Sequence, residues 1–124
     1  MRQSIRLAVL LVAGCVTSAA WAQDSCNVPY APVVPAGEGA TRAQILQARD
    51  DVTAFISQSD QYQNCLQLYL QQQEAAAQSS NRPMNESVRS GIMAKAAANQ
   101  REKERVGVAF NQAVRAYNTA NSGQ

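Results

Sequence analysis

The fold is decided by residues 41–77, whose sequence is TRAQILQARDDVTAFISQSDQYQNCLQLYLQQQEAAA. Thr41 and Gln44 have the spacing of a capping box, in which each side chain satisfies a free backbone amide at a helix start. Mostly apolar side chains then recur every seven residues in two interleaved rows. The first row is Ile45, Val52, Ser59 and Leu66, and the second is Ala48, Phe55, Tyr62, Tyr69 and Ala76. This pattern predicts one long amphipathic helix with a seam that requires a partner helix.

The partner helix is expected downstream, over residues 84–120. Its seam rows are Ile92, Asn99, Val106, Ala113 and Ala120, interleaved with Ala96, Lys103, Phe110 and Tyr117. Residues 78–83 separate the helices, because Ser and Asn favour turns and Pro83 suits the first turn of a new helix. Such a short connection makes the two helices antiparallel neighbours. The predicted fold is therefore all-α, with a coiled-coil-like antiparallel hairpin over residues 41–120.

Polar side chains interrupt the seam at one level. With a turn centred near residues 80–81, Tyr62 lies opposite Asn99 and Ser59 approaches Lys103. We expect the Asn99 amide to pair with the Tyr62 hydroxyl, and the Lys103 amine to pair with Ser59. Such a layer costs stability but excludes registers that leave it unpaired. The four residues form a register lock or a notch that recognises a partner's side chain, unless the seam opens and Lys103 reaches water.

Residues 1–22 have the pattern of a signal peptide and are excluded from the fold. Arg2 and Arg6 form its basic region, residues 7–13 form a short apolar core, and residues 20–22 (AWA) form a cleavage site. The apolar core is far shorter than the roughly 20 residues that a membrane-spanning helix needs. The pattern predicts a periplasmic or secreted protein.

A second processing signal overlaps the first. Residues 12–15 (VAGC) resemble a bacterial lipobox, in which Cys15 is lipidated and becomes the first residue. This alternative places the protein on a lipid anchor, and membrane attachment is expected only in that case. Both alternatives export the chain.

Charge and cysteine content of the exported chain narrow the possible functions. The net charge of +2 of the full chain comes from Arg2 and Arg6. Removal of residues 1–22 leaves nine basic and nine acidic side chains, so the exported chain is neutral and its charge gives no support for nucleic-acid binding. Cys26 and Cys65 remain as an even pair, which in an exported protein predicts one disulfide.

Residues 23–40 form a Pro-rich segment, which we call the strap. Between residues 29 and 35 every third residue is proline, the period of polyproline II. An extended run from Cys26 to Thr41 spans about 46 Å, whereas the helix from Thr41 to Cys65 spans about 36 Å. The strap can therefore run back along the helix and be bonded at Cys65, with the excess length in a glycine turn. The alternative is a ligand for an aromatic-lined groove of another protein.

No catalytic, cofactor-binding or metal-binding residues are expected. The chain has no histidine, the commonest general base and metal ligand. Its sequence contains no glycine-rich phosphate loop, zinc spacing or calcium loop. Ser59 and Lys103 could form a catalytic pair, but no oxyanion-binding residues accompany them. We therefore expect a protein that is not an enzyme.

Two segments carry a resemblance to known proteins. CNVPYAP (residues 26–32) and REKERVGVAFNQAVRAYN (residues 101–118) resemble a family of small uncharacterised exported proteins of alphaproteobacteria. The resemblance implies export and the helical layout, and it supplies no activity.

The expected function is that of a non-enzymatic envelope protein acting through protein–protein contact, as an adaptor or holdase. A protein partner or a homodimer is expected because two long helices leave much apolar surface to cover. The alternative is an amphipathic module that contacts the membrane surface. The polar face of the first helix argues against it, because that face is rich in glutamine rather than in Lys and Arg.

Overall fold

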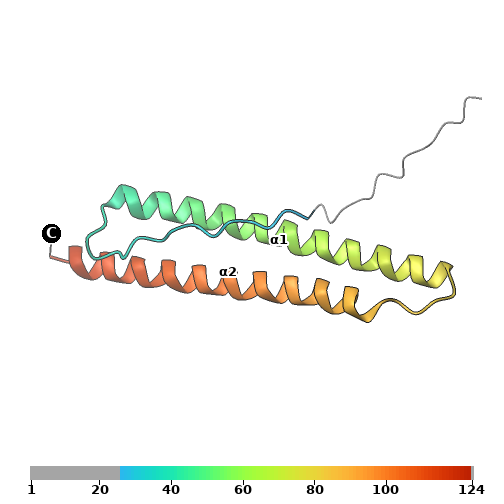
Figure 1. The fold of residues 1–124 in the computed structure, drawn as a ribbon. Helices are drawn as coiled ribbons and strands as arrows, with labels where there is room; N and C mark the ends of the chain where they lie inside the picture. Colours follow the sequence, from blue (N-terminus) through green and yellow to red (C-terminus); the bar gives the residue numbers. More distant parts are fainter. Residues whose placement is uncertain (1–25, 124) are drawn as a thin grey trace, which may run out of the picture.

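The computed structural model describes residues 26–123, which form two antiparallel helices with an extended segment lying along them (Figure 1). Helix α1 spans Arg42–Ser79 and helix α2 spans Glu86–Asn121, and no strand occurs in the described part of the chain. The predicted signal peptide and the first three residues of the strap lie outside the described residues. The fold is the all-α hairpin that the heptad pattern predicts.

The start of α1 is a capping box. The Thr41 hydroxyl accepts a hydrogen bond from the Gln44 amide (3.2 Å), and the Gln44 side chain accepts one from the Thr41 amide (2.8 Å). Beyond this cap, 38 residues without glycine or proline continue the helix. The predicted start of the first helix is confirmed.

The end of α1 is fixed by Asn81, which has a left-handed backbone (φ 53°). Its amide donates to the Gln78 carbonyl (3.1 Å), and the next amide, of Arg82, donates to the Ala77 carbonyl (3.0 Å). These two bonds form a Schellman motif, in which asparagine takes the position more often held by glycine.

The connection between the helices lies about two residues later than predicted. α1 continues through Ser79 and Ser80 is its C-cap, and both hydroxyls donate hydrogen bonds to carbonyls four residues earlier. The prediction that Pro83 lies in the first turn of the second helix is wrong. Asn85 caps α2 instead, because its side chain accepts from the Ser87 amide (2.9 Å).

The predicted seam is buried along most of its length. Buried side chains on α1 are Ile45, Ala48, Val52, Phe55, Ser59, Tyr62 and Leu66, and those on α2 are Ile92, Asn99, Val106 and Ala113. The second row of α2 is only half-buried, and comprises Ala96, Lys103, Phe110 and Tyr117. Ala76 and Ala120, predicted as seam positions, are exposed because each lies near the end of its helix, where the pairing finishes.

The core consists of two apolar clusters on either side of the polar level. One cluster contains Val52, Phe55 and Val106, and is extended by Ala31, Val34 and Phe110. The other contains Tyr62, Leu66 and Ile92, and is extended by Cys26, Tyr69, Leu70, Val88 and Ala96. These neighbours agree with the predicted register. Both clusters include strap residues, so the core is built from two helices and an extended segment.

Candidate functional site

The described residues contain neither a metal-binding cluster nor a membrane span. No three Cys, Asp or Glu side chains in residues 26–123 lie close enough to hold a metal ion. Neither helix of this region is apolar enough over its length to cross a membrane. The longest described segment outside the two helices is the strap.

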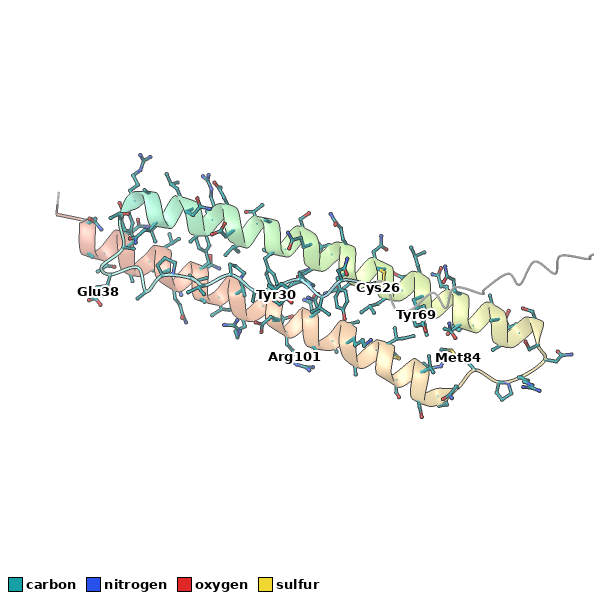
Figure 2. All side chains as sticks on the ribbon, turned by 45° about the horizontal axis from the view of Figure 1, so that its top comes forward. Cys26, Tyr30, Glu38, Tyr69, Met84 and Arg101 are labelled. Carbon is teal, nitrogen blue, oxygen red and sulfur yellow. A yellow bond between two sulfur atoms is a disulfide. The ribbon has the colours of Figure 1, made fainter. Side chains whose placement is uncertain are left out.

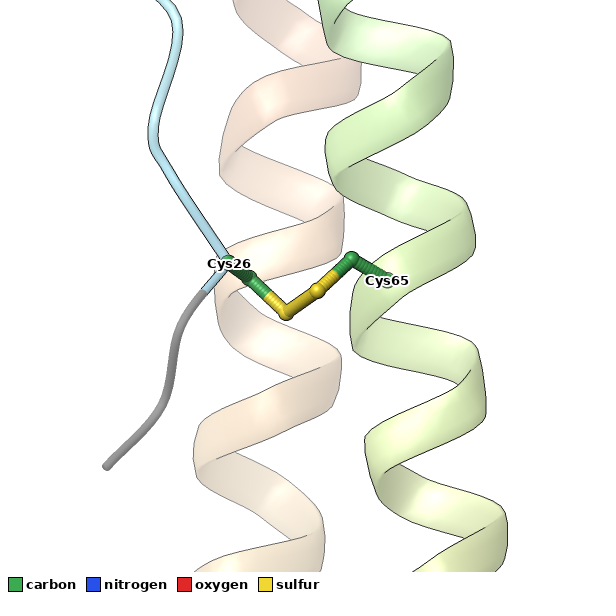
Figure 3. Close-up of a disulfide and its surroundings, with 2 residues drawn as sticks. All are labelled: Cys26 and Cys65. Atoms are coloured by element: carbon green, nitrogen blue, oxygen red, sulfur yellow. A yellow bond between two sulfur atoms is a disulfide. The ribbon is translucent and has the colours of Figure 1, made fainter. Parts of the chain in front are cut away.

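A disulfide fixes the first described residue of the strap. Cys26 is bonded to Cys65 of α1, with the two Cα atoms 5.6 Å apart (Figure 3). From Cys26 the strap runs back along the groove between the helices to a turn at residues 37–39 (Figure 1). The predicted disulfide and the antiparallel course of the strap are both confirmed.

Gly37 fixes the other end of the strap. It is buried, has φ +90°, and lies so close to α2 that a Cβ atom would be 2.1 Å from the Ala113 carbonyl oxygen. Only glycine fits this position, because an L side chain is strained at this φ and has no space. The strap is thus bonded to α1 at one end and packed against the backbone of α2 at the other.

From Pro29 to Gly37 the strap presents three rows of side chains, with the period of polyproline II, whereas Val28, three residues before Ala31, is 64% exposed. The inner row is Ala31, Val34 and Gly37, the proline row is Pro29, Pro32 and Pro35, and the outer row is Tyr30, Val33 and Ala36. Ala31 and Val34 of the inner row pack on the core cluster of Val52, Phe55 and Val106, and the prolines are half-buried. The outer row is exposed, with Tyr30 at 94% and Val33 at 93%.

Packing and the disulfide hold the strap in place. Residues 26–36 make no backbone–backbone hydrogen bond with any other described residue. The backbone groups of the outer row therefore remain available to water or to another molecule.

A shallow hollow lies beside the disulfide, between the strap and α1. Its volume is about 470 Å³, and Tyr30 and Tyr62 line it together with the amides of Gln58 and Gln61. Figure 2 shows Tyr30 on the strap, between Cys26 and the turn at Glu38. The hollow adds amide donors and acceptors beside the exposed Tyr30 side chain.

The opposite groove of the hairpin is closed by polar side chains. Each residue of an α-helix is rotated by about 100° from the one before it. Gln63, four residues after Ser59, therefore flanks the seam on one side, and Cys65, one residue before Leu66, flanks it on the other side. Gln63 donates to the Gln100 side chain across the helices (3.2 Å). In the same groove Lys103 pairs with Asp60, and Arg89 pairs with Glu74. We call this side the bridged groove and the other side the strap groove.

The predicted polar layer exists, but its predicted pairs are wrong. Asn99 donates to the fully buried Ser59 hydroxyl (3.1 Å) and accepts from Gln63 (2.8 Å), and its partner is not Tyr62. Tyr62 instead packs with the second apolar cluster and lines the hollow by the strap. Lys103 bonds to Asp60 and not to Ser59, because a charged amine favours a partly hydrated carboxylate over a buried hydroxyl.

Every described buried side-chain nitrogen and oxygen has a hydrogen-bond partner. The layer therefore has the contacts that a register lock requires. Asn99 is only 7% exposed, so it offers little surface for recognition by another protein. The notch interpretation receives no support from this geometry.

One surface ion pair has altered pKa values. Hydrogen bonds from the Arg105 guanidinium (2.9 and 2.6 Å) lower the pKa of the Glu102 carboxyl, and the same contacts raise the pKa of Arg105. Both groups are exposed on α2 and three residues apart, so the pair is a local feature of a solvated helix face. It marks no site.

Comparisons with protein-family models, curated proteins and solved structures find no match for this chain. The resemblance of residues 26–32 and 101–118 to small exported alphaproteobacterial proteins stays a prediction. The outer row could not be predicted from the sequence, because a period of three indicates that rows exist but not which row faces the helices.

Proposed function

We propose that this chain is an exported, non-enzymatic helical protein of the cell envelope that acts through protein–protein contact, with the outer row of the strap as its contact surface. One observation carries the proposal: Tyr30 and Val33 are almost fully exposed on a segment that is fixed at both ends. Tyrosine is enriched in protein interfaces. A contact segment already ordered in the free protein loses less conformational entropy on binding.

The spacing of the prolines favours one mode of recognition. Addition of the strap to a partner's sheet needs backbone amides at alternate residues along one edge. Pro29 and Pro35 remove amides from one edge, and Pro32 removes one from the other. Docking of the extended strap in an aromatic-lined groove needs no such ladder. We infer a partner that binds the side chains of Tyr30 and Val33 and does not pair with the backbone of the strap.

The disulfide supports the proposed compartment. Disulfides persist in oxidising environments such as the bacterial periplasm and the extracellular space. With the signal-peptide pattern of residues 1–22, the Cys26–Cys65 bond favours a periplasmic or secreted protein. Intact-mass measurement of the exported protein tests this placement. The proposal expects a chain beginning at Gln23, whereas an acylated chain beginning at Cys15 would establish the lipid-anchored alternative.

Site-specific photocrosslinking in intact cells tests the contact surface. A photoreactive residue at Tyr30 should yield a discrete crosslinked product, and Val33→Ser in the same chain should remove it. The matched control is a photoreactive residue at Val108, which is 55% exposed on α2. The proposal fails if the Tyr30 position gives no product, or if both positions give the same products.

Vesicle co-sedimentation tests the alternative function at the membrane surface. The outer row carries no basic side chain, so neither neutral nor anionic vesicles should pull down the protein. If the protein co-sediments with vesicles and Tyr30→Ser abolishes this, the outer row binds a lipid surface and not a protein partner.

A further inference from the structure

We propose that the strap groove is also a docking site for the strap of a second copy of this chain, so that two copies exchange straps and become linked by Cys26–Cys65 bonds between copies. The proposal concerns the inner row and the groove. It is independent of the outer row and of the function proposed above.

The strap of a second copy fits the strap groove because this groove already holds an identical strap. Ala31 and Val34 pack on the cluster of Val52, Phe55 and Val106, and Gly37 lies against Ala113. A second copy carries the same inner row and the same groove, so every one of these contacts can form between copies. Exchange of an identical element between protomers is a low-cost route to a dimer for this reason.

The strap can leave its own groove without breaking a hydrogen-bonded ladder. Residues 26–36 form no backbone–backbone hydrogen bond with the other described residues. The turn that joins the strap to α1 contains one such bond, from the Ala40 amide to the Gly37 carbonyl (3.1 Å). Gly39 in this turn has no atom near the place of a Cβ. The turn can therefore open as a hinge once the disulfide is broken.

The position of the hinge gives the geometry of the exchanged dimer. The turn lies at the end of the hairpin where α1 begins and α2 finishes (Figure 1). A strap that opens there extends beyond this end, into the groove of a second hairpin placed end to end with the first. Residues 38–40 then bridge the junction, which they can span over about 10 Å. A two-fold axis at the junction makes the exchange reciprocal and closed.

Thiol–disulfide exchange with a small thiol and its disulfide opens and recloses the bond. The thiolate of the small thiol attacks one protein sulfur, and the other cysteine leaves as a thiolate. A second small thiolate then attacks the mixed disulfide, releasing the oxidised small disulfide and a second protein thiolate. Reclosure reverses these steps, with Cys26 of one copy and Cys65 of the second copy as the final pair. Electrons balance, since each bond broken reduces two protein sulfurs and oxidises two small thiols.

Concentration decides between the two forms. Because the strap is covalently tethered to its own groove, its effective concentration there is high. Dilute protein therefore favours the closed monomer. The exchanged dimer becomes favoured only when copies are concentrated while the disulfide is open. Reoxidation then fixes whichever form is present.

Complementary cysteine variants test the proposal. In a chain that begins at Gln23, and so lacks Cys15, Cys26→Ser keeps only the groove cysteine and Cys65→Ser keeps only the strap cysteine, so neither forms the native bond alone. Mixed in a buffer of small thiol and small disulfide, they should give a covalent heterodimer as the main product on a non-reducing gel. Homodimers of either variant should be minor products, because docking of the strap brings Cys26 to Cys65 and does not pair two Cys26 or two Cys65 side chains.

Two results would overturn the proposal. Homodimers as abundant as the heterodimer would mean random thiol coupling. Circular dichroism checks that each variant remains helical. A second measurement uses the unaltered cysteines: isotopically heavy and light chains are reduced together at high concentration and reoxidised. Linked Cys26–Cys65 peptides with one heavy and one light half are expected, and uniformly unmixed pairs would rule the exchange out.

Discussion

The strap groove and the bridged groove flank the same helix pair and are closed by different physical means. In the strap groove, an extended segment buries apolar side chains and is held by a disulfide and a close glycine contact. In the bridged groove, side chains such as Lys103 and Asp60 meet across the helices and stay partly hydrated. Apolar burial is worth about 25 cal/mol per Å², whereas exposed ion pairs contribute about 0–1 kcal/mol each. Stability should therefore depend mainly on the strap groove.

This difference explains how two helices can form a core. A hairpin of two helices has few fully buried positions, and small folds usually need an added constraint. Here Ala31 and Val34 complete one cluster, and Cys26 contributes to the other. The strap thereby takes part of the role that a third helix has in a bundle.

Loss of the disulfide should have the largest effect on stability. The Cys26–Cys65 bond has a sequence separation of 39 and, in the chain-entropy model, contributes about 4 kcal/mol. The double variant Cys26→Ser/Cys65→Ser should therefore melt far below the parent, and limited proteolysis should cut it near Tyr30. Equal melting temperatures for the two proteins would contradict the importance assigned to the strap.

Gly37→Ala should have the next largest effect. The left-handed backbone alone costs an alanine about 1–2 kcal/mol, and its Cβ would also overlap the Ala113 carbonyl unless the strap moved. Gly39→Ala is the control, because nothing lies within 4 Å of its Cβ position. Thermal melting should separate the two variants clearly. If both alanines have the same effect, the strap is not packed against α2 at Gly37.

A smaller effect distinguishes two neighbouring valines. Val34→Ser removes a half-buried side chain from the core cluster and should cost about 1 kcal/mol. Val33→Ser changes a side chain that is 93% exposed and should leave the melting temperature within error. Urea unfolding of both variants measures the difference. The reverse order of stabilities would mean that the inner and outer rows are interchanged.

The smallest effect is expected in the bridged groove. Asp60→Asn removes the charge that pairs with Lys103, but the Asp60 side chain is 61% exposed, so solvent already weakens the interaction. We expect a loss of about 0.5 kcal/mol or less, decreasing further at high salt. Urea unfolding at low and high salt measures it. A loss as large as that of Gly37→Ala would mean that the two grooves contribute equally.

Much of the fold is predictable from local and covalent rules. The capping box depends on two nearby residues, the seam on heptad spacing, and the strap course on the length between Cys26 and Cys65. The contacts of long polar side chains were harder to predict, because Asn99 and Lys103 can reach several partners. α2 begins two residues later than predicted, because Asn85 is a better N-cap than Arg82, the residue before Pro83. To predict which row of the strap is exposed, one must know how the strap is rotated about its own axis. The period of the prolines does not give that rotation.

The rotation of the strap is measured most directly by nuclear Overhauser effects in the oxidised protein. The Val34 methyl groups should give cross-peaks to the Phe55 ring and to the Val106 methyl groups, because these side chains form one cluster. The Val33 methyl groups should give no cross-peaks to Phe55 or Val106, because Val33 is 93% exposed and lies outside this cluster. Cross-peaks from Val33 to Phe55 or Val106, or their absence from Val34, would contradict a strap that completes the core with one row and exposes the other.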